Sequence, residues 1–184
     1  MEISMLYIHH YQSPLGGITM SSNGEALTGL WFDCQKQNSC SLEKEEDLVN
    51  TTDHVLKETE KWLDNYFGGI EPNFMPPILF NGTEFQETVW NILLSIPYGK
   101  IITYGEIANE VAKDRGIERM SAQAVGGAVA QNPIALIIPC HRVIGKNGNL
   151  TGYAAGIDKK IELLKLEGVD TSGMYINKLE IKVN

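Results

Sequence analysis

Residues 136–145 read LIIPCHRVIG, a pattern that places a cysteine beside a histidine at the end of an apolar run. A thiolate is a strong nucleophile, and a neighbouring imidazole can take its proton or stabilise its charge. Cys140 and His141 are therefore the first candidates for chemistry. A free cysteine is also often no more than a small buried hydrophobe, so a purely structural thiol stays open as the alternative.

These two residues need other elements to position them. On an extended chain, neighbouring side chains face opposite ways, so His141 must act through a water or sit on a turn at residues 139–140. A histidine that serves as a base usually needs an orienting carboxylate. Glu167, at the end of the last expected helix, is one candidate among eleven acids in residues 79–184.

Composition and charge divide the 184-residue chain in two. Residues 1–78 carry 4 Lys/Arg and 12 Asp/Glu, whereas residues 79–184 carry 11 of each, so all of the net charge of −8 lies in the first part. Such asymmetry suggests two parts with different jobs, and it leaves nucleic acid open as a partner of the second part, with a modest and salt-dependent affinity.

The cysteine content and hydropathy favour a cytoplasmic protein. Only three cysteines are present, and no basic-then-apolar leader or apolar run long enough to span a bilayer is seen. An odd, low count argues against a disulfide framework. His9, His10, Cys34, Cys40 and His54 could supply zinc ligands, but they lack the paired spacing of a zinc site, so we expect no metal.

The first part is predicted to be a small sheet and one helix. Short β-rich runs within residues 5–32 are separated by turn signals, including Asn23-Gly24, a strong hairpin signal. Residues 33–50 are polar and acidic, which indicates a surface loop. Apolar residues at helical spacing predict a helix over 53–67, ended by Gly68-Gly69. Residues 70–78, rich in proline, read as a linker.

The second part is predicted to be mostly helical. Thr83 and Thr103 each open a capping box, before helices over 85–94 and 104–112. A charged loop over 113–120 leads to a helix over 122–131, so the last two helices outline a helix-turn-helix unit. Residues 134–138 are predicted to be extended and buried, and a final amphipathic helix covers 156–167.

The helix over 122–131 has an unusual composition, because it contains adjacent glycines at 126 and 127. Each glycine costs a helix roughly 1 kcal/mol relative to alanine. One interpretation is tight helix–helix packing. The other is a helix whose backbone approaches a narrow surface such as a DNA minor groove. Gln123 and Gln131 are the polar side chains it offers, which favours a shape reader over a base reader.

At residues 139–143, PCHRV, the chain resembles the O6-alkylguanine-DNA alkyltransferases, also called methylated-DNA–protein-cysteine methyltransferases. The resemblance covers about residues 85–168. It also includes a short motif, SPLG, at residues 13–16. The other matching motifs are Phe85-Gln-x-x-Val-Trp90, Ile96-Pro-Tyr-Gly-Lys100, Thr103-Tyr104-Gly105, Ala124-Val-Gly-Gly-Ala128, Asn132-Pro133, Gly152-Tyr153 and Leu163-Leu164 followed by Glu167.

The resemblance implies an α+β protein. Residues 1–78 would form a small α/β, ribonuclease-H-like domain around a three-stranded antiparallel sheet. Residues 79–184 would form a helical domain with the active site and a helix-turn-helix-like DNA-binding unit. The implied activity is DNA repair: a damaged guanine is flipped out of the duplex through the minor groove, and its O6-alkyl group, or the O4-methyl of thymine, passes irreversibly to a cysteine. Each molecule would act once, as a monomer without a cofactor.

The same resemblance implies a role for each matching residue. Cys140 would accept the alkyl group, His141 would take its proton through a water, and Glu167 would orient His141. Residues that bind the base or the DNA would be Tyr104, Gly105, Gln123, Asn132, Val143, Tyr153, Ala154 and Lys160. Tyr104 would serve the guanine ring, the carbonyls of Cys140 and Val143 would hold its amino group, and Asn132 would pin the turn before the active-site segment.

One departure concerns DNA affinity rather than the chemistry. The family usually has an arginine where this chain has Gln123, and that arginine fills the gap left by the flipped base. Gln123 can still form hydrogen bonds but carries no charge. The loop over 113–120 is also longer than in typical members, and its Arg115 or Arg119 could supply a substitute cation.

Two other classes of function remain to be weighed. A non-catalytic lesion-binding protein of the alkyltransferase-like kind would lack the reactive cysteine, which Cys140 argues against. A cysteine hydrolase would need an oxyanion hole, and no nearby motif suggests one. The hydrolase would turn over many times, the repair protein once, and the lesion-binding protein not at all.

Overall fold

The computed structural model describes residues 6–33, 35, 48–49 and 53–176. It forms two compact units, Met1–Asn81 with Pro133–Ile137, and Gly82–Asn132 with Ile138–Asn184. The short segment Pro133–Ile137, which ends two residues before Pro139-Cys140 begins to turn, thus belongs to the first unit, although the residues on both sides of it belong to the second. Most of the loop expected over 33–50, with Cys34 and Cys40, lies outside the described residues.

The first unit contains the predicted antiparallel sheet. Its strands are β1 (Leu6–Ser13), β2 (Gly16–Ser22), β3 (Leu27–Phe32) and β4 (Leu48–Val49), in the order β3-β2-β1-β4. The three long strands are antiparallel, which confirms the prediction, and the two-residue β4 adds a parallel edge that was not predicted. Asn23 and Gly24 form the predicted turn: the Asn23 side chain accepts from two backbone N–H groups, and Gly24 has a φ of 91°.

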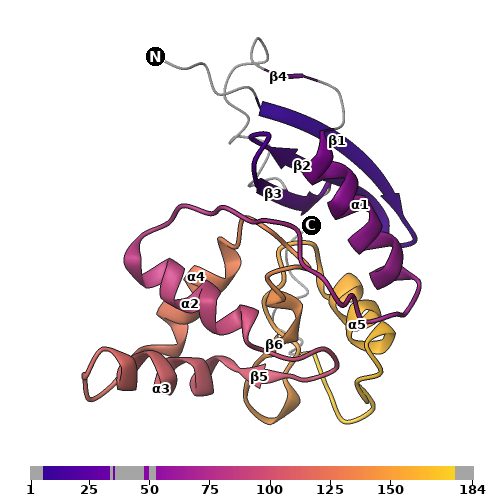
Figure 1. Ribbon diagram of the computed structural model, residues 1–184. Coiled ribbons are helices and arrows are strands. Elements are labelled where there is room, and N and C mark those ends of the chain that lie inside the picture. The colour runs from indigo at the N-terminus through magenta and orange to yellow at the C-terminus, as the bar shows by residue number, and fades with distance from the viewer. Residues whose placement is uncertain (1–5, 34, 36–47, 50–52, 177–184) are drawn as a thin grey trace. The chain divides into compact units, whose positions relative to one another are not determined.

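Helix α1 (His54–Phe67) contacts β1, β2 and β3 and lies along the sheet (Figure 1). Asp53 caps its first turn by accepting from the Leu56 N–H, and Gly69 ends it in a left-handed conformation with a φ of 75°. The buried face of the helix, which includes Leu63 and Tyr66, contributes to the core of this unit.

The apolar run before Cys140 is buried as predicted, but it is not an extended strand. Leu136 has a φ of 70°, a left-handed conformation that costs a branched residue energy, and the Ile137 N–H donates to the Ala135 carbonyl in a tight turn. The cause is an anchor on β3: Leu30 N–H donates to Pro133 O and its carbonyl accepts from Ala135 N–H, at 3.0 and 2.8 Å.

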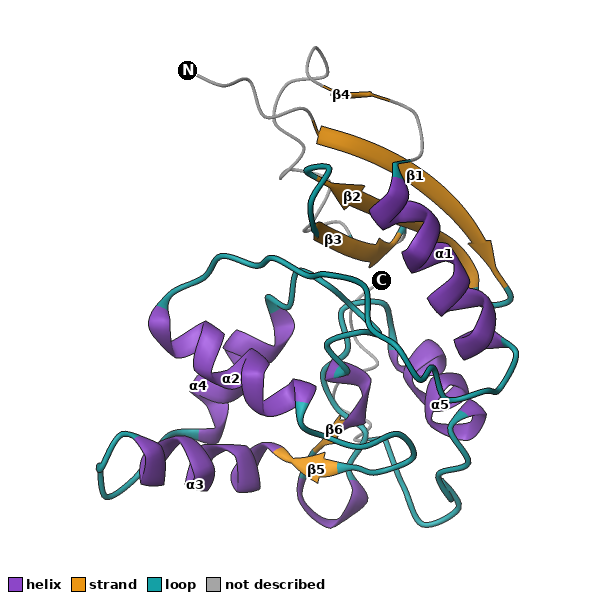
Figure 2. Cartoon of the chain, viewed as in Figure 1, coloured by secondary structure: helices purple, strands orange, loops and turns teal. Residues whose placement is uncertain are grey.

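The second unit is mostly helical (Figure 2). Its main elements are α2 (Glu84–Leu94), β5 (Ile102–Thr103), α3 (Tyr104–Asp114), α4 (Ala122–Ala130), η2 (Cys140–Arg142), β6 (Val143–Ile144), η3 (Lys146–Gly148) and α5 (Ile157–Leu166). The capping boxes at Thr83 and Thr103 are both complete, which confirms these two helix starts. Strands β5 and β6 pair in parallel and tie the start of α3 to the turn after Cys140.

Helices α2, α3 and α4 contact one another, and α3 with α4 forms the predicted helix-turn-helix pair. Helix α3 continues to Asp114, two residues beyond its expected end, so the connecting loop is shorter than predicted. The Trp90 indole N–H donates to the Ala128 carbonyl at 2.9 Å and locks α2 to α4. None of the described helices is both long and apolar enough to cross a membrane.

Candidate active site

Cys140 lies on the first residue of a 3₁₀ turn, η2, that begins directly after Pro139. On an extended chain, the side chains of Cys140 and His141 would face opposite ways. The turn removes this constraint. The Cys140 N–H donates to the Ile138 carbonyl at 2.8 Å, and the Cys140 carbonyl accepts from the Val143 N–H. The cysteine is 7% exposed, so the thiol is held in a buried, hydrogen-bonded turn.

His141 and Glu167 meet at the end of α5. The Nε2 atom of His141 lies 2.6 Å from Oε1 of Glu167, and both side chains are fully buried. An ionised carboxylate can only accept, so Nε2 carries the ring proton and Nδ1 is the basic nitrogen. The structure thus brings His141 and Glu167 into contact, and Cys140 directly precedes His141 on the same turn.

Arg142, which was not predicted as a site residue, completes this cluster. Its Nε and Nη2 donate to the two oxygens of Glu167 at 2.8 and 3.1 Å, and its Nη1 donates to the Ile96 carbonyl at 2.6 Å. The residue is 8% exposed. A paired guanidinium of this kind fixes the position of a carboxylate in two directions. The sequence feature that could have pointed to Arg142 is its position directly after the candidate base His141, within an apolar stretch of the chain.

The turn at residues 97–100 holds the other side of Glu167. The Gly99 N–H donates to Oε2 of Glu167 at 3.0 Å, and Tyr98 donates its hydroxyl to the Leu166 carbonyl at 3.3 Å. Gly99 has a φ of 70°, and a Cβ there would lie 2.8 Å from the Glu167 carbonyl oxygen. Only glycine fits this close approach. The motif Ile96-Pro-Tyr-Gly-Lys100 therefore serves to fix the carboxylate.

The ionisation of the cluster follows from burial and from these contacts. Burial raises the pKa of the Cys140 thiol, although the Asn132 hydrogen bond and the charge of Lys160 oppose the shift. Burial lowers the pKa of His141 in spite of its bond to Glu167. Burial also opposes ionisation of Glu167, but His141 and Arg142 outweigh it and hold the pKa of this carboxyl at about 2. At neutral pH the resting site is a protonated thiol, a neutral imidazole and a carboxylate.

Asn132 joins the end of α4 to the segment before the thiol. Its side chain, 6% exposed, donates to the Ile138 carbonyl at 2.7 Å, and it also bonds to the Cys140 thiol. This position agrees with the predicted pinning of the turn.

Replacing Asn132 with alanine is expected to destabilise the protein by about 1–3 kcal/mol, because it leaves a buried carbonyl without its donor. The free energy of unfolding, measured by urea titration, checks this. Asn91→Ala, at an exposed position on α2, is the control and should stay within about 0.5 kcal/mol of the wild type. Equal stabilities of the two variants would contradict the assignment.

Tyr104 and Lys160 converge on the same two backbone carbonyls. The Tyr104 hydroxyl lies 3.3 and 3.2 Å from the carbonyl oxygens of Thr151 and Gly152, and the Lys160 ammonium lies 2.9 and 3.4 Å from them. Lys160 is fully buried. Both residues thereby fix the loop that follows η3, and a Cβ at Gly152 would lie 3.0 Å from the Tyr104 hydroxyl.

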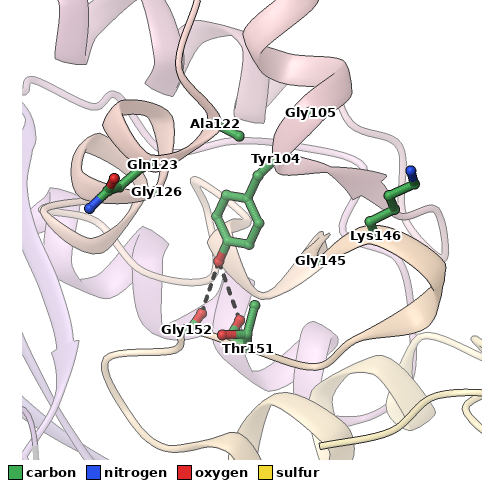
Figure 3. Close-up of a pocket in the computed structure, with 9 residues that line it drawn as sticks. All are labelled: Tyr104, Gly105, Ala122, Gln123, Gly126, Gly145, Lys146, Thr151 and Gly152. Carbon is green, nitrogen blue, oxygen red and sulfur yellow. Dashed lines mark hydrogen bonds between the residues drawn. The ribbon is translucent and has the colours of Figure 1, made fainter. Parts of the chain in front are cut away.

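A cavity of about 590 Å³ opens beside Tyr104 (Figure 3). Three predicted site residues line it, namely Tyr104, Gly105 and Gln123, together with Ala122, Gly126, Gly145, Lys146, Thr151 and Gly152. Cys140 is not among the residues that line this cavity. A Cβ at Gly126 would lie 3.8 Å from the Tyr104 ring, an ordinary contact, and a Cβ at Gly127 would meet nothing within 4 Å. Neither glycine of α4 is therefore explained by tight helix packing.

The remaining predicted residues lie in three different environments. Val143 is fully buried on β6, Ala154 is exposed, and Tyr153 is partly buried.

The two arginines that could replace the missing cation also differ. Arg115 pairs with Glu84 at 3.4 Å and stacks over the Phe85 ring at 5.4 Å, whereas Arg119 is exposed on the loop before α4. Within the described residues, no group of three or more His, Cys, Asp or Glu side chains could hold a metal ion.

Two family profiles together match most of the chain. Residues 6–79 match the ribonuclease-like domain of 6-O-methylguanine DNA methyltransferase, and residues 84–169 match the DNA-binding domain of the same family. The two matches meet near residue 80 and include the strands, α1 and every residue of the cluster around Glu167.

Individual relatives agree with these profiles. A methylated-DNA–protein-cysteine methyltransferase of Methanosarcina acetivorans is 42% identical over 163 residues, which cover 89% of this chain and 99% of the relative. Its counterpart in Mycobacterium leprae is 39% identical, with 89% and 93% covered. The solved structure of Mycobacterium tuberculosis OGT in complex with DNA is similar with a TM-score of 0.75 and 37% identity, over 88% of this chain and 92% of that chain. The chain therefore belongs to the 6-O-methylguanine DNA methyltransferase family.

Proposed function

We propose that this protein repairs DNA by moving the alkyl group of O6-alkylguanine onto Cys140, once per molecule. One observation carries the proposal: in a chain that matches both domains of the family, a buried thiol lies next to a histidine that is bonded to a fixed, ionised carboxylate. A structural cysteine would not need such a cluster beside it.

The proposed step is a displacement at the alkyl carbon. A bond forms between the Cys140 sulfur and that carbon while the bond between the carbon and O6 breaks, and its electron pair stays on the guanine. The thiol proton passes through a water to Nδ1 of His141, and the Glu167 carboxylate stabilises the resulting imidazolium. The guanine leaves as an anion that carries this electron pair, and it takes a proton from solvent water. The thioether has no route back, so the protein is consumed.

DNA is the proposed partner of the helix-turn-helix pair α3 and α4. The similar tuberculosis OGT structure contains DNA, which supports this assignment. Helix α4 carries no charged residue, and its exposed side chains are small, except for Gln123. A helix of this kind fits a minor groove by shape rather than by base-edge hydrogen bonds. Gln123 would then stand near the gap left by the extruded base, and Tyr104 near the base itself.

The protein is proposed to act as a monomer without a cofactor. Every residue assigned to the reaction or to the base lies in the second unit of one chain, between Tyr104 and Glu167. A second copy is therefore not needed to complete the site.

The test is the mass of the intact protein after incubation with a duplex that contains one O6-methylguanine. We expect one added methyl group per molecule, no addition with the undamaged duplex, and the modified peptide to contain Cys140 rather than Cys34 or Cys40. Lesion binding without a mass change would instead support a non-catalytic lesion-binding protein. Release of product over many turnovers, with an unmodified thiol, would support a hydrolase.

A further inference from the structure

We propose that Lys146 is the residue that anchors a DNA phosphate at the mouth of the cavity beside Tyr104, and so supplies near the site the positive charge that Gln123 does not. This inference rests on the proposed function, because it takes DNA as the ligand. Lys146 lies outside the cluster around Glu167 and takes no part in the proposed displacement.

The charge of the cavity lining is the first observation. Of the nine described residues that line the cavity, Lys146 has the only formal charge, and none is acidic. The acid adjacent in sequence to the lining, Glu106, is held in a capping box, where it accepts from the N–H and the hydroxyl of Thr103. Among the side chains that line this cavity, a polyanion therefore meets one cation and no carboxylate, in a chain whose net charge is −8.

The second observation is that the Lys146 side chain is accessible to a ligand. It is exposed, and it takes part in none of the ion pairs found among the described residues. Arg115, by contrast, is engaged with Glu84 and Phe85. Figure 3 shows Lys146 and Gln123 on opposite sides of the Tyr104 ring. A strand seated over this ring could thus contact Gln123 on one side and Lys146 on the other.

The backbone beneath Lys146 is built to hold it in place. The Gly145 N–H donates to the Asn149 carbonyl at 2.7 Å, and the Asn149 N–H returns to the Lys146 carbonyl at 3.3 Å. Asn147 adopts a left-handed conformation with a φ of 60°, which few residue types tolerate. Hydrogen bonds from Tyr175 to Gly148 and from Leu150 to Tyr175 fasten the same turn. A fixed backbone lowers the entropy cost of holding a lysine against a phosphate.

The test measures binding of an undamaged duplex by fluorescence anisotropy from about 50 to 200 mM salt. We expect Lys146→Gln to make the slope of log K against log salt shallower by about 0.9, the value for one lost phosphate contact. The loss should be the same for two duplexes of unrelated sequence, because phosphate contacts carry no sequence information. Lys146→Arg should keep the wild-type slope.

Lys57→Gln is the matched control, because it removes the same charge from an exposed position on α1 in the other unit. An unchanged slope for Lys146→Gln, an equal change for Lys57→Gln, or a loss that depends on DNA sequence would each overturn the inference. The outcome is independent of alkyl transfer. If the wild type transfers a methyl group and the slope does not change, only the role of Lys146 fails. If the slope changes but no transfer occurs, the proposed reaction fails and the DNA contact stands.

Discussion

Replacing Cys140 with serine is expected to abolish alkyl acceptance while the protein stays folded and still binds DNA. Serine is nearly isosteric, so the 3₁₀ turn and its backbone hydrogen bonds persist. A hydroxyl is a far weaker nucleophile than a thiol, and this buried site has no means to ionise it. The transfer rate should fall by on the order of 10⁶-fold, the scale of loss when a nucleophilic side chain is removed.

Intact-protein mass measures methyl acceptance, and fluorescence anisotropy measures DNA binding. With an excess of methylated duplex, Cys140→Ser should gain no mass, and its affinity for the undamaged duplex should equal that of the wild type. A variant with serine at both Cys34 and Cys40 is the control and should accept one methyl group at the wild-type rate. Methylation of Cys140→Ser, on any residue, would contradict the assignment of Cys140 as the acceptor.

The high pKa of the Cys140 thiol fits a protein that acts only once. The thiolate is the form that oxidants attack, and burial keeps this thiol protonated at neutral pH. A protein that cannot regenerate its cysteine is thereby protected until a substrate arrives. The neutral His141, with Nε2 committed to Glu167, then offers Nδ1 as the proton acceptor at the moment of attack.

The local rules of sequence predicted much of the fold. Asn23-Gly24 specifies a turn, and Thr83 and Thr103 specify helix starts, because each acts through hydrogen bonds to residues no more than three positions away. The motif PCHRV, together with Glu167, predicted the three residues proposed for the reaction, namely Cys140, His141 and Glu167. These residues were found through the family resemblance, since a cysteine beside a histidine is by itself a weak signal.

The parts that sequence did not predict depend on contacts between distant segments. Residues 134–138 were expected to be extended, but Leu30 of β3 binds Pro133 and Ala135 through its backbone, and Leu136 directly after them is left-handed. Arg142 and Gly99 reach Glu167 from positions 25 and 68 residues away. The spacing of apolar residues predicts local helices and strands, but it does not predict contacts between residues this far apart in the sequence. The same holds for the cavity beside Tyr104, which is assembled from the starts of α3 and α4 and from η3.

Replacing Glu167 with glutamine is expected to weaken both the stability of the protein and the transfer step. The change keeps the shape of the side chain but leaves Arg142, which is nearly buried, without its counter-charge. Breaking a buried ion pair from one side costs about 3–5 kcal/mol. Glutamine also cannot stabilise an imidazolium at His141, so we expect a transfer rate lower by on the order of 10²-fold or more, the scale of general-base assistance.

The pH dependence of stability isolates the role of the Glu167 charge. Its pKa falls from an ordinary 4.5 to about 2 in the folded protein. A lowered pKa contributes stability that is fully present above about pH 4.5 and is lost as the pH falls towards 2, in total about 3 kcal/mol. The difference in unfolding free energy between the wild type and Glu167→Gln should therefore shrink by about this amount over that range. Other carboxylates titrate in both proteins and cancel.

Glu162→Gln is the control on the same helix, because Glu162 is exposed and forms a surface pair with Lys165 at 2.9 Å. It should change the unfolding free energy by less than about 0.5 kcal/mol, with no effect on transfer. Transfer by Glu167→Gln is measured in single-turnover experiments at a temperature where the variant is folded, across pH 5 to 9. A wild-type rate and pH profile in the folded variant would mean that Glu167 only stabilises the fold. A slower rate with a shifted profile would show that it acts on the thiol through His141, because a purely structural carboxylate does not move the pH dependence of the chemistry.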